Sequence, residues 1–319
     1  MALDPQTAAL LSQLVFMQDG VERDMGAFDV AAARAASQAM WQGLNGPDVG
    51  GCTITALNVP AAAGPVPARL YRPAAADATL ALVVFLHGGG WALGDLDGYQ
   101  TLVKALCGAS GAAFLSVDYR LAPENKFPAG LEDGLAAVRW VWAEAAYLGV
   151  DPARVAVMGD SAGGNLAAVI AQQLRASADG RLAAQFLLYP MLDVASRHDV
   201  YPSRQRFGDG GYLISRRDID VTTAWYLPDP ALAHDPRVSP LLASDFDGLP
   251  PAVILTAGFD PLCDEAKAYA DKLRAARVPV TFKCFENTVH AFLSFGDLAI
   301  ARAGRAWLAS QVKRLLATA

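Results

Sequence analysis

The stretch "VAVMGDSAGGNLAAVIAQQL" (Val155–Leu174) passes from one kind of backbone to another within a few residues. Its first four residues form a continuous apolar run, as in a buried strand, and its last ten carry apolar side chains at helical spacing. Between the two stands the segment GDSAGG, Gly159 to Gly164. The order strand, glycine-rich turn, helix predicts a layered α/β fold in which a serine stands on a sharp turn at the end of a buried strand.

This serine, Ser161, occupies the centre of a G-x-S-x-G pattern, which is typical of a catalytic nucleophile. Its backbone must be strained for the hydroxyl to project from the sheet edge. Side chains at Gly159 or Gly163 would collide with the neighbouring helix and strand. The N-terminus of the following helix also favours a developing negative charge. A plain helix N-cap serine is the alternative interpretation.

Outward from this turn, strand-like runs alternate with helix-like runs along most of the chain. The later strands are continuously apolar, which indicates a mostly parallel sheet covered by helices on both faces. Eight strands are expected, at Thr53–Val59, Pro67–Arg72, Leu80–Leu86, Ala113–Val117, Val155–Met158, Gln185–Tyr189, Ala252–Ala257 and Val280–Glu286. Helices are expected at Gly98–Ala109, Ala129–Leu148, Ala162–Ala176, Leu262–Ala276 and Asp297–Thr318.

Two segments do not fit the alternation. The N-terminal residues Leu10, Leu11, Leu14 and Val15 have the spacing of an amphipathic helix. Between the strands that end at 189 and begin at 252 lie about sixty residues, more than a crossover needs. We therefore expect a catalytic domain over 46–319, with a helical cap made from residues 1–45 and an insertion at about 192–228. The alternative for the insertion is a decorated loop with no role in binding.

A second glycine-rich turn follows the strand in "LVVFLHGGGWALG" (Leu82–Gly94). Three consecutive glycines order poorly, so a folded chain needs a reason to keep them. Without Cβ atoms their backbone can approach a bound carbonyl and present amides to a developing oxyanion. A phosphate-binding loop is the alternative, but that loop needs a Lys and a Ser or Thr where this chain has Trp-Ala-Leu.

The oxyanion donors predicted from this pattern are the amides of Gly88, Gly89 and Ala162. Gly90 and His87 are expected to support the loop, with His87 bracing it through hydrogen bonds.

Of the remaining histidines, His290 directly follows the last expected strand, in "ENTVHAF". The strand ends of a parallel sheet meet at one edge, so His290 is the predicted base for Ser161. His198 and His234 fall in or near the insertion and are expected at the surface.

The acid that orients this base must also follow a strand. In "AVILTAGFDPLCDEA", Asp260 comes just after the expected strand. Asp264 and Glu265 fall in the first turn of the next helix, where acids are favoured whatever the chemistry. Asp260 is therefore the predicted partner of the histidine, which it would orient without taking its proton.

Composition limits the classes of partner. A net charge of −6 and a pI near 5.2 argue against nucleic acid. No run approaches the ~18 apolar residues of a membrane span, and the N-terminus lacks the cationic start of a secretory signal. The four cysteines, Cys52, Cys107, Cys263 and Cys284, lack zinc-site spacing and are expected to be reduced, mostly buried thiols of a cytoplasmic protein. No metal or cofactor is expected.

Taken together, the motifs resemble the hormone-sensitive-lipase-like family (bacterial family IV) of α/β-hydrolase carboxylesterases, over about residues 50–315. The resemblance rests on HGGGW (87–91), DYRLAPENKFPA (118–129), GDSAGGN (159–165), SPLLA (239–243), DPLCDEA (260–266) and HAF (290–292). It implies an eight-stranded sheet with a helical cap, no cofactor, and the GDSAG branch of the family. Cys263, where arginine is common, and HAF in place of HGF are departures. Many relatives dimerise, some by pairing edge strands, and the sequence leaves monomer or homodimer open.

The predicted function is a serine carboxylesterase that hydrolyses small-molecule esters of short to medium acyl chain through an acyl-enzyme. The same residues acting on an amide, lactone, carbamate or thioester are the alternative, and a non-catalytic small-molecule receptor is a minor one. The residues expected to contact substrate are Trp91, Asp160, Tyr189, Leu192, Phe16 and Phe207.

Overall fold

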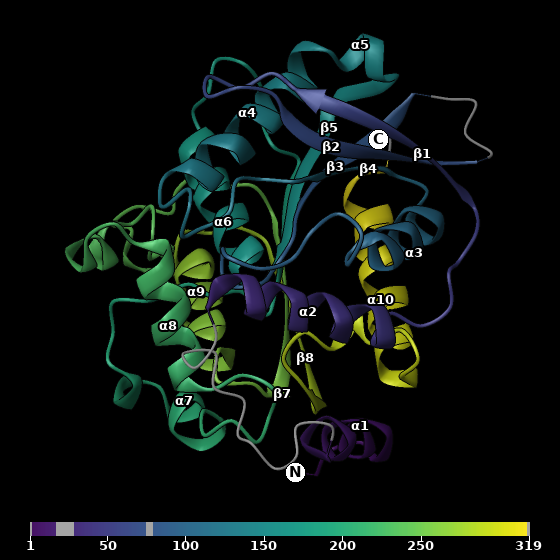
Figure 1. Cartoon of the computed structure of the whole chain (residues 1–319). Helices are drawn as coiled ribbons and strands as arrows, with labels where there is room; N and C mark the ends of the chain where they lie inside the picture. The colour runs from purple at the N-terminus through teal and green to yellow at the C-terminus, as the bar shows by residue number, and fades with distance from the viewer. Residues whose placement is uncertain (1, 17–28, 75–78, 318–319) are drawn as a thin grey trace.

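The computed structural model describes residues 2–16, 29–74 and 79–317. Within these residues one eight-stranded sheet runs through the protein in the order β1-β2-β4-β3-β5-β6-β7-β8 (Figure 1). Only β2 runs against its neighbours, so the predicted mostly parallel sheet is confirmed. The strands are β1 Cys52–Val59, β2 Val66–Pro73, β3 Leu80–Leu86, β4 Ala113–Val117, β5 Val150–Asp160, β6 Ala184–Leu188, β7 Ala252–Phe259 and β8 Val280–Val289.

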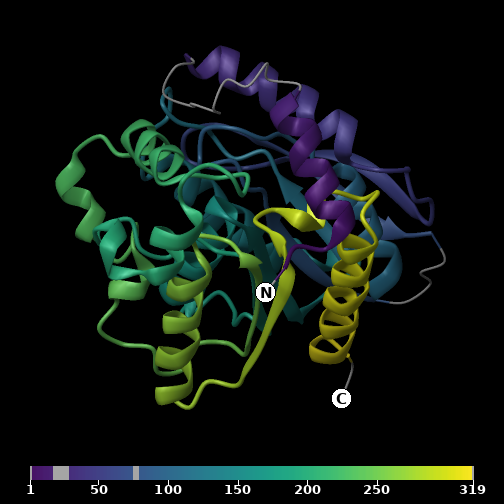
Figure 2. The same ribbon diagram turned by 90° about the horizontal axis from the view of Figure 1, so that it is seen from below.

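Helices cover both faces of this sheet, as the apolar strands require. All seven residues of β3 are buried, with Leu82, Val84 and Leu86 facing one apolar core and Val83 and Phe85 the other. The helices of the first core are α4 Ala129–Ala143, α5 Ala145–Leu148, α6 Ala162–Leu174 and α9 Cys263–Ala275. Those of the second are α3 Gln100–Ser110 and α10 Ala299–Leu315. The views in Figures 1 and 2 accordingly place α9 and α10 on opposite sides of the sheet. The single helix predicted over 129–148 is two helices.

The strand register brings distant segments to one edge of the sheet. Leu86 pairs with Gly159, which places the end of β3 beside the end of β5. Phe259 pairs with Val289, which places the end of β7 beside the end of β8. Ligands of open α/β sheets bind outside the carboxyl ends of the strands, where the strand order reverses. The sheet order reverses at β3 and β5, so this edge is where a site is expected.

Helices from the N-terminal segment and from the insertion lie over that edge. The N-terminal segment forms α1 Pro5–Phe16 and α2 Val30–Leu44, and the insertion forms α7 Pro202–Phe207 and α8 Arg216–Tyr226. Figure 1 shows α2 crossing above the strand ends. Short 3₁₀ helices complete the fold, η2 His198–Val200, η3 Pro230–His234, η4 Pro240–Leu242 and η5 Phe292–Ser294. Among the described residues no helix has the length and apolar character needed to cross a membrane.

The four cysteines are free thiols. Only Cys107 is buried, whereas Cys52, Cys263 and Cys284 are half-buried. The expectation of mostly buried thiols is therefore wrong for three of them, because Cys52 and Cys284 lie on the two edge strands and Cys263 begins a surface helix.

Candidate active site

Ser161 stands on the turn between β5 and α6 with φ 56° and ψ −118°, a region that residues with side chains rarely adopt. Its amide donates to the Leu188 carbonyl at 2.9 Å, and its side chain makes no helix-capping hydrogen bond. A Cβ on Gly159 would lie 2.1 Å from the Gly163 carbonyl oxygen, and one on Gly163 would lie 2.0 Å from the Leu86 carbonyl oxygen. Both glycines are thus required by the tight turn, and the N-cap interpretation of the serine is excluded.

The serine hydroxyl meets a histidine and an aspartate from two other strand ends. Ser161 Oγ lies 2.9 Å from His290 Nε2, and His290 Nδ1 lies 2.8 Å from Asp260 Oδ2. The other oxygen of Asp260 accepts the Leu262 amide at 2.8 Å. Because Asp260 accepts from Nδ1–H, the neutral imidazole leaves its Nε2 lone pair free for the serine proton. The three residues predicted from sequence therefore form one hydrogen-bonded chain.

This chain is shielded from water to different degrees. Asp260 is completely buried, His290 is 3% exposed, and Ser161 is half-buried at the open end. The ring of Tyr189 lies edge-on to the imidazole, with centroids 4.9 Å apart. In a water-poor setting the aspartate stabilises a protonated imidazole more strongly than it would in water. The arrangement can accept and return a proton at a serine that acts as a nucleophile.

The glycine loop after β3 is braced as predicted for His87. The His87 Nδ1 atom bonds the Gly88 carbonyl at 2.8 Å, and the His87 carbonyl accepts the Tyr119 hydroxyl at 2.8 Å. The His87 ring is stacked on Tyr119 with centroids 4.5 Å apart. Burial lowers the pKa of His87 to about 4, so the brace is a neutral imidazole.

The assignment of Gly88 as an oxyanion donor needs correction. Its amide donates to Asp160 Oδ1 at 2.7 Å and is not available to a ligand. The next two glycines have φ +112° (Gly89) and +59° (Gly90), conformations that favour glycine. Within the described chain the amides of Gly89, Gly90 and Ala162 have no protein acceptor. Gly90, predicted only as support, therefore replaces Gly88 as a candidate donor.

Asp160 is also not the predicted substrate contact. Its carboxylate is completely buried, and its second oxygen accepts the Tyr99 hydroxyl at 3.1 Å. Burial raises the pKa of Asp160 to about 7, against the lowering effect of the Gly88 and Tyr99 hydrogen bonds. Both oxygens are bonded to protein groups and the carboxylate is completely buried, so it is not exposed to a ligand.

The other residues expected to contact substrate lie mainly in the interior. Trp91 is stacked on Tyr226 of α8 at 4.4 Å, and Leu192 is completely buried. Phe207 packs against the ring of Phe259. Tyr189, described above, is completely buried beside the imidazole. Phe16 ends α1, and its side chain lies outside the described part of the chain. Substrate contact by these residues stays a prediction.

A buried ion pair that the sequence did not reveal ties the insertion to α9, the helix that follows Asp260. Arg204 of α7 and Glu265 of α9 are 1% and 0% exposed and bond each other. Glu265 also accepts the Leu192 amide at 2.6 Å, and Asp264 accepts the Ser203 amide at 2.8 Å. Sixty-one residues separate Arg204 from Glu265, and no local pattern links them, so the first-turn explanation of these acids is incomplete.

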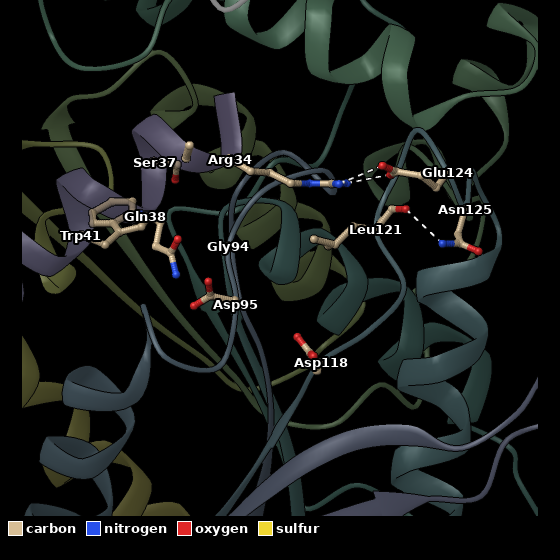
Figure 3. Close-up of a pocket in the computed structure, with 11 residues that line it drawn as sticks. Arg34, Ser37, Gln38, Trp41, Gly94, Asp95, Asp118, Leu121, Glu124 and Asn125 are labelled. Carbon is tan, nitrogen blue, oxygen red and sulfur yellow. Dashed lines mark hydrogen bonds and ion pairs between the residues drawn. The ribbon is translucent and has the colours of Figure 1, made fainter. Parts of the chain in front are cut away.

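A cavity of about 500 Å³ lies between α2 and the loops that follow β3 and β4. In Figure 3 Arg34 extends from α2 to Glu124, with which it forms two hydrogen bonds of 2.7 and 2.8 Å. Arg34 also bonds the carbonyls of Ala92 and Ala122. Asp95 and Asp118 line the same cavity. Ser161, His290 and Asp260 do not line it. Glu124, which belongs to the DYRLAPENKFPA segment (118–129), therefore holds α2 to the loop that follows β4.

The fold and this constellation agree with known proteins. The model of a family described as having the α/β-hydrolase fold matches residues 83–294, and the chain belongs to that family. A carboxylic ester hydrolase of Mycobacterium tuberculosis, LipN, is 43% identical over 93% of this chain and 78% of its own length. An ethyl acetate hydrolase of Pseudomonas putida is 41% identical over 73% of each chain. The predicted kinship with carboxylesterases is confirmed.

Solved structures give the same result. An ester hydrolase from the metagenome of Lake Arreo, determined with a bipyridine phosphonate derivative, has a TM-score of 0.94 and 35% identity, covering 99% of this chain and 100% of that one. An esterase of the archaeon Pyrobaculum calidifontis has a TM-score of 0.90 and 34% identity, covering 99% of both chains.

Proposed function

We propose that this protein is a serine carboxylesterase that hydrolyses small carboxylic esters through an acyl-enzyme. The observation that carries the proposal is the continuous chain from Ser161 Oγ to His290 Nε2 and from His290 Nδ1 to Asp260 Oδ2, at 2.9 and 2.8 Å. A nucleophile bonded to a base that is oriented by an acid is the arrangement that acyl transfer requires. The esterases among the relatives support the choice of ester as substrate.

In this mechanism Ser161 attacks the ester carbonyl carbon while His290 takes the hydroxyl proton at Nε2. Asp260 stabilises the resulting imidazolium and keeps its own charge. The amides of Gly89, Gly90 and Ala162 are the proposed donors to the oxyanion. His290 then protonates the leaving alcohol, and a water molecule repeats the two steps on the acyl-enzyme. Each oxyanion donor of this kind is worth ~10²–10³ in rate.

The segments 1–45 and 192–228 act as a cap in this proposal. Its support is that α8 lies directly on the oxyanion loop: a Cβ on Gly90 would be 2.5 Å from Thr222, and Trp91 is stacked on Tyr226. A cap that closes over the site favours esters of short to medium acyl chain. Membership of the GDSAG branch, a cytoplasmic location and the choice between monomer and homodimer stay predictions.

The test is a fluorophosphonate label together with a series of p-nitrophenyl esters from acetate to laurate. We expect one label on Ser161, turnover that is greatest for the shorter chains, and neither in Ser161→Ala. Matched amide, lactone and thioester substrates separate the alternative bonds. An unlabelled, inactive wild-type protein that binds small molecules would instead be the receptor alternative, which the intact Ser161–His290 bond disfavours.

A further inference from the structure

The glycine loop is fixed at two consecutive peptide planes by three side chains. In the first plane, His87 to Gly88, the carbonyl accepts the Tyr119 hydroxyl at 2.8 Å and the amide donates to Asp160 at 2.7 Å. In the second plane, Gly88 to Gly89, the carbonyl accepts from the His87 ring at 2.8 Å. A trans peptide is planar, so its N–H points opposite its C=O. Holding the Gly88 carbonyl therefore sets the direction of the Gly89 amide.

Asp160 is the anchor at the centre of this arrangement. It immediately precedes Ser161, and the pairing of Leu86 with Gly159 places it beside the start of the loop. The fit is close, because a Cβ on Gly88 would lie 2.7 Å from Asp160 Oδ2 and 2.9 Å from the Tyr99 hydroxyl. The nucleophile and its oxyanion donors are thus joined through one carboxylate.

We propose that Asp160 is a positioning residue for the proposed ester hydrolysis: its carboxylate fixes the first peptide plane of the loop through the Gly88 amide, and together with His87, which fixes the second, it aims the Gly89 and Gly90 amides at the oxyanion formed on attack by Ser161. Tyr99 holds the carboxylate in turn, through its second oxygen. Asp160 itself does not touch the substrate. The inference rests on the proposed function, because it assigns a role within the same site.

The groups that face this carboxylate come from four elements. They are Tyr99 before α3, Tyr119 after β4, Tyr189 after β6 and His290 after β8. Burial raises the pKa of all three tyrosines well above the ordinary value, so they are neutral hydroxyls at working pH. His290 is the one member of this set that becomes a cation during the reaction. An ionised Asp160 therefore also favours the imidazolium that forms when Ser161 loses its proton.

Burial places the pKa of Asp160 at about 7, so the carboxylate takes up a proton as the pH falls below that value. The anchor then loses its charge-assisted hydrogen bond to the Gly88 amide. The kcat/KM of the wild-type protein should therefore fall as the pH drops through about 7, and replacing the Asp160 carboxylate should remove this contribution to the acid limb.

The experiment compares Asp160→Ala and Asp160→Asn with a matched control, Asp133→Ala. Asp133 is an equally buried carboxylate that accepts a backbone amide, from Arg120 at 2.8 Å, but it braces α4. Rates on p-nitrophenyl acetate are expressed per fluorophosphonate-titrated serine, so that misfolded protein does not count. Binding of a trifluoromethyl ketone, whose hemiketal carries the same oxyanion, is measured beside KM.

For Asp160→Ala we expect kcat per titrated site to fall about 100-fold, the loss of one oxyanion donor, with KM nearly unchanged. Trifluoromethyl ketone affinity should fall by a similar factor. Asp160→Asn keeps an oxygen for the Gly88 amide, so its kcat at pH 8 should stay within about tenfold of wild type, and its acid limb should lose the contribution of the Asp160 proton near pH 7. Asp133→Ala should lose thermal stability and keep its kcat per site.

Two results would overturn the inference while leaving the proposed function intact. One is an Asp160→Ala protein with wild-type kcat and ketone affinity per titrated site. The other is an acid limb that is the same in wild type and Asp160→Asn, and this comparison decides the matter if the alanine variant does not fold. A wild-type protein that neither hydrolyses esters nor takes the label would overturn both proposals together.

Discussion

Replacing Asp260 by Asn changes one atom and reverses the hydrogen-bonding role of the histidine. In the wild-type protein Asp260 accepts from two donors, the Leu262 amide and His290 Nδ1–H. An Asn side chain has one acceptor oxygen. The Leu262 amide is a fixed backbone donor and keeps that oxygen, so the Asn amide group faces Nδ1 and donates to it. The imidazole must then carry its proton on Nε2, where it can no longer accept the Ser161 proton.

The expected loss in kcat is about 10⁴-fold, the value for an acid-to-amide change that inverts the tautomer in a serine–histidine–aspartate site. At 1.36 kcal/mol per factor of ten this is about 5 kcal/mol of transition-state stabilisation. KM should change little, because the side chain at position 260, whether Asp or Asn, does not contact the bound ester. The fold should persist, since Asn fills the same buried space and keeps the Leu262 hydrogen bond.

The assay is steady-state hydrolysis of p-nitrophenyl butyrate, with protein concentration from absorbance and the folded fraction from thermal unfolding. Asp264→Asn is the matched control, because this neighbouring acid accepts the Ser203 amide and does not reach the imidazole. It should retain wild-type kcat. A folded Asp260→Asn protein with kcat within about tenfold of wild type would refute the tautomer argument.

Three further predictions concern stability. Gly159→Ala puts a methyl group against the Gly163 carbonyl and should lower the free energy of unfolding by about 3 kcal/mol or more, measured as a lower Tm. The same variant should also lose activity. Arg204→Met leaves Glu265 as an unpaired buried charge, at a cost of about 3–5 kcal/mol in urea unfolding, and adding Glu265→Gln should recover most of it. In the folded protein the pKa of His87 is about 4, whereas its ordinary value is 6.5, so the wild-type protein loses stability as the pH falls from 6.5 toward 4. Its free energy of unfolding, compared with that of His87→Asn, should therefore drop by about 2 kcal/mol from pH 7 to pH 5.

The parts of the site that the sequence predicted share one physical property. Ser161, Asp260 and His290 each follow a strand of the parallel part of the sheet, and parallel strands deliver their ends to a common edge. The strands could be predicted from their apolar runs, and six of the eight observed strands match within two residues at each end. The predicted bounds were least accurate where a strand extends beyond its continuous apolar run. An example is β5, which begins at Val150 instead of Val155.

The parts that the sequence missed depend on hydrogen bonds between distant segments. The pattern of three glycines predicted the amides of Gly88 and Gly89 at the oxyanion, and the choice of Gly88 was wrong. Asp160 removes the Gly88 amide from use. Likewise Glu265 matched a helix first turn, and its pairing with Arg204 depends on where α7 lies on the fold. Local patterns specify residue types at an edge, whereas packing decides their partners.

The identity of the nucleophile is tested most directly by the mass of the quenched enzyme. Mixing with p-nitrophenyl acetate, acid quenching and peptide mass spectrometry should find a single acetyl group on the peptide containing Ser161, at a level that rises with substrate concentration and disappears in Ser161→Ala. Rapid hydrolysis with no acetylated peptide, or acetylation confined to another residue, would contradict the mechanism.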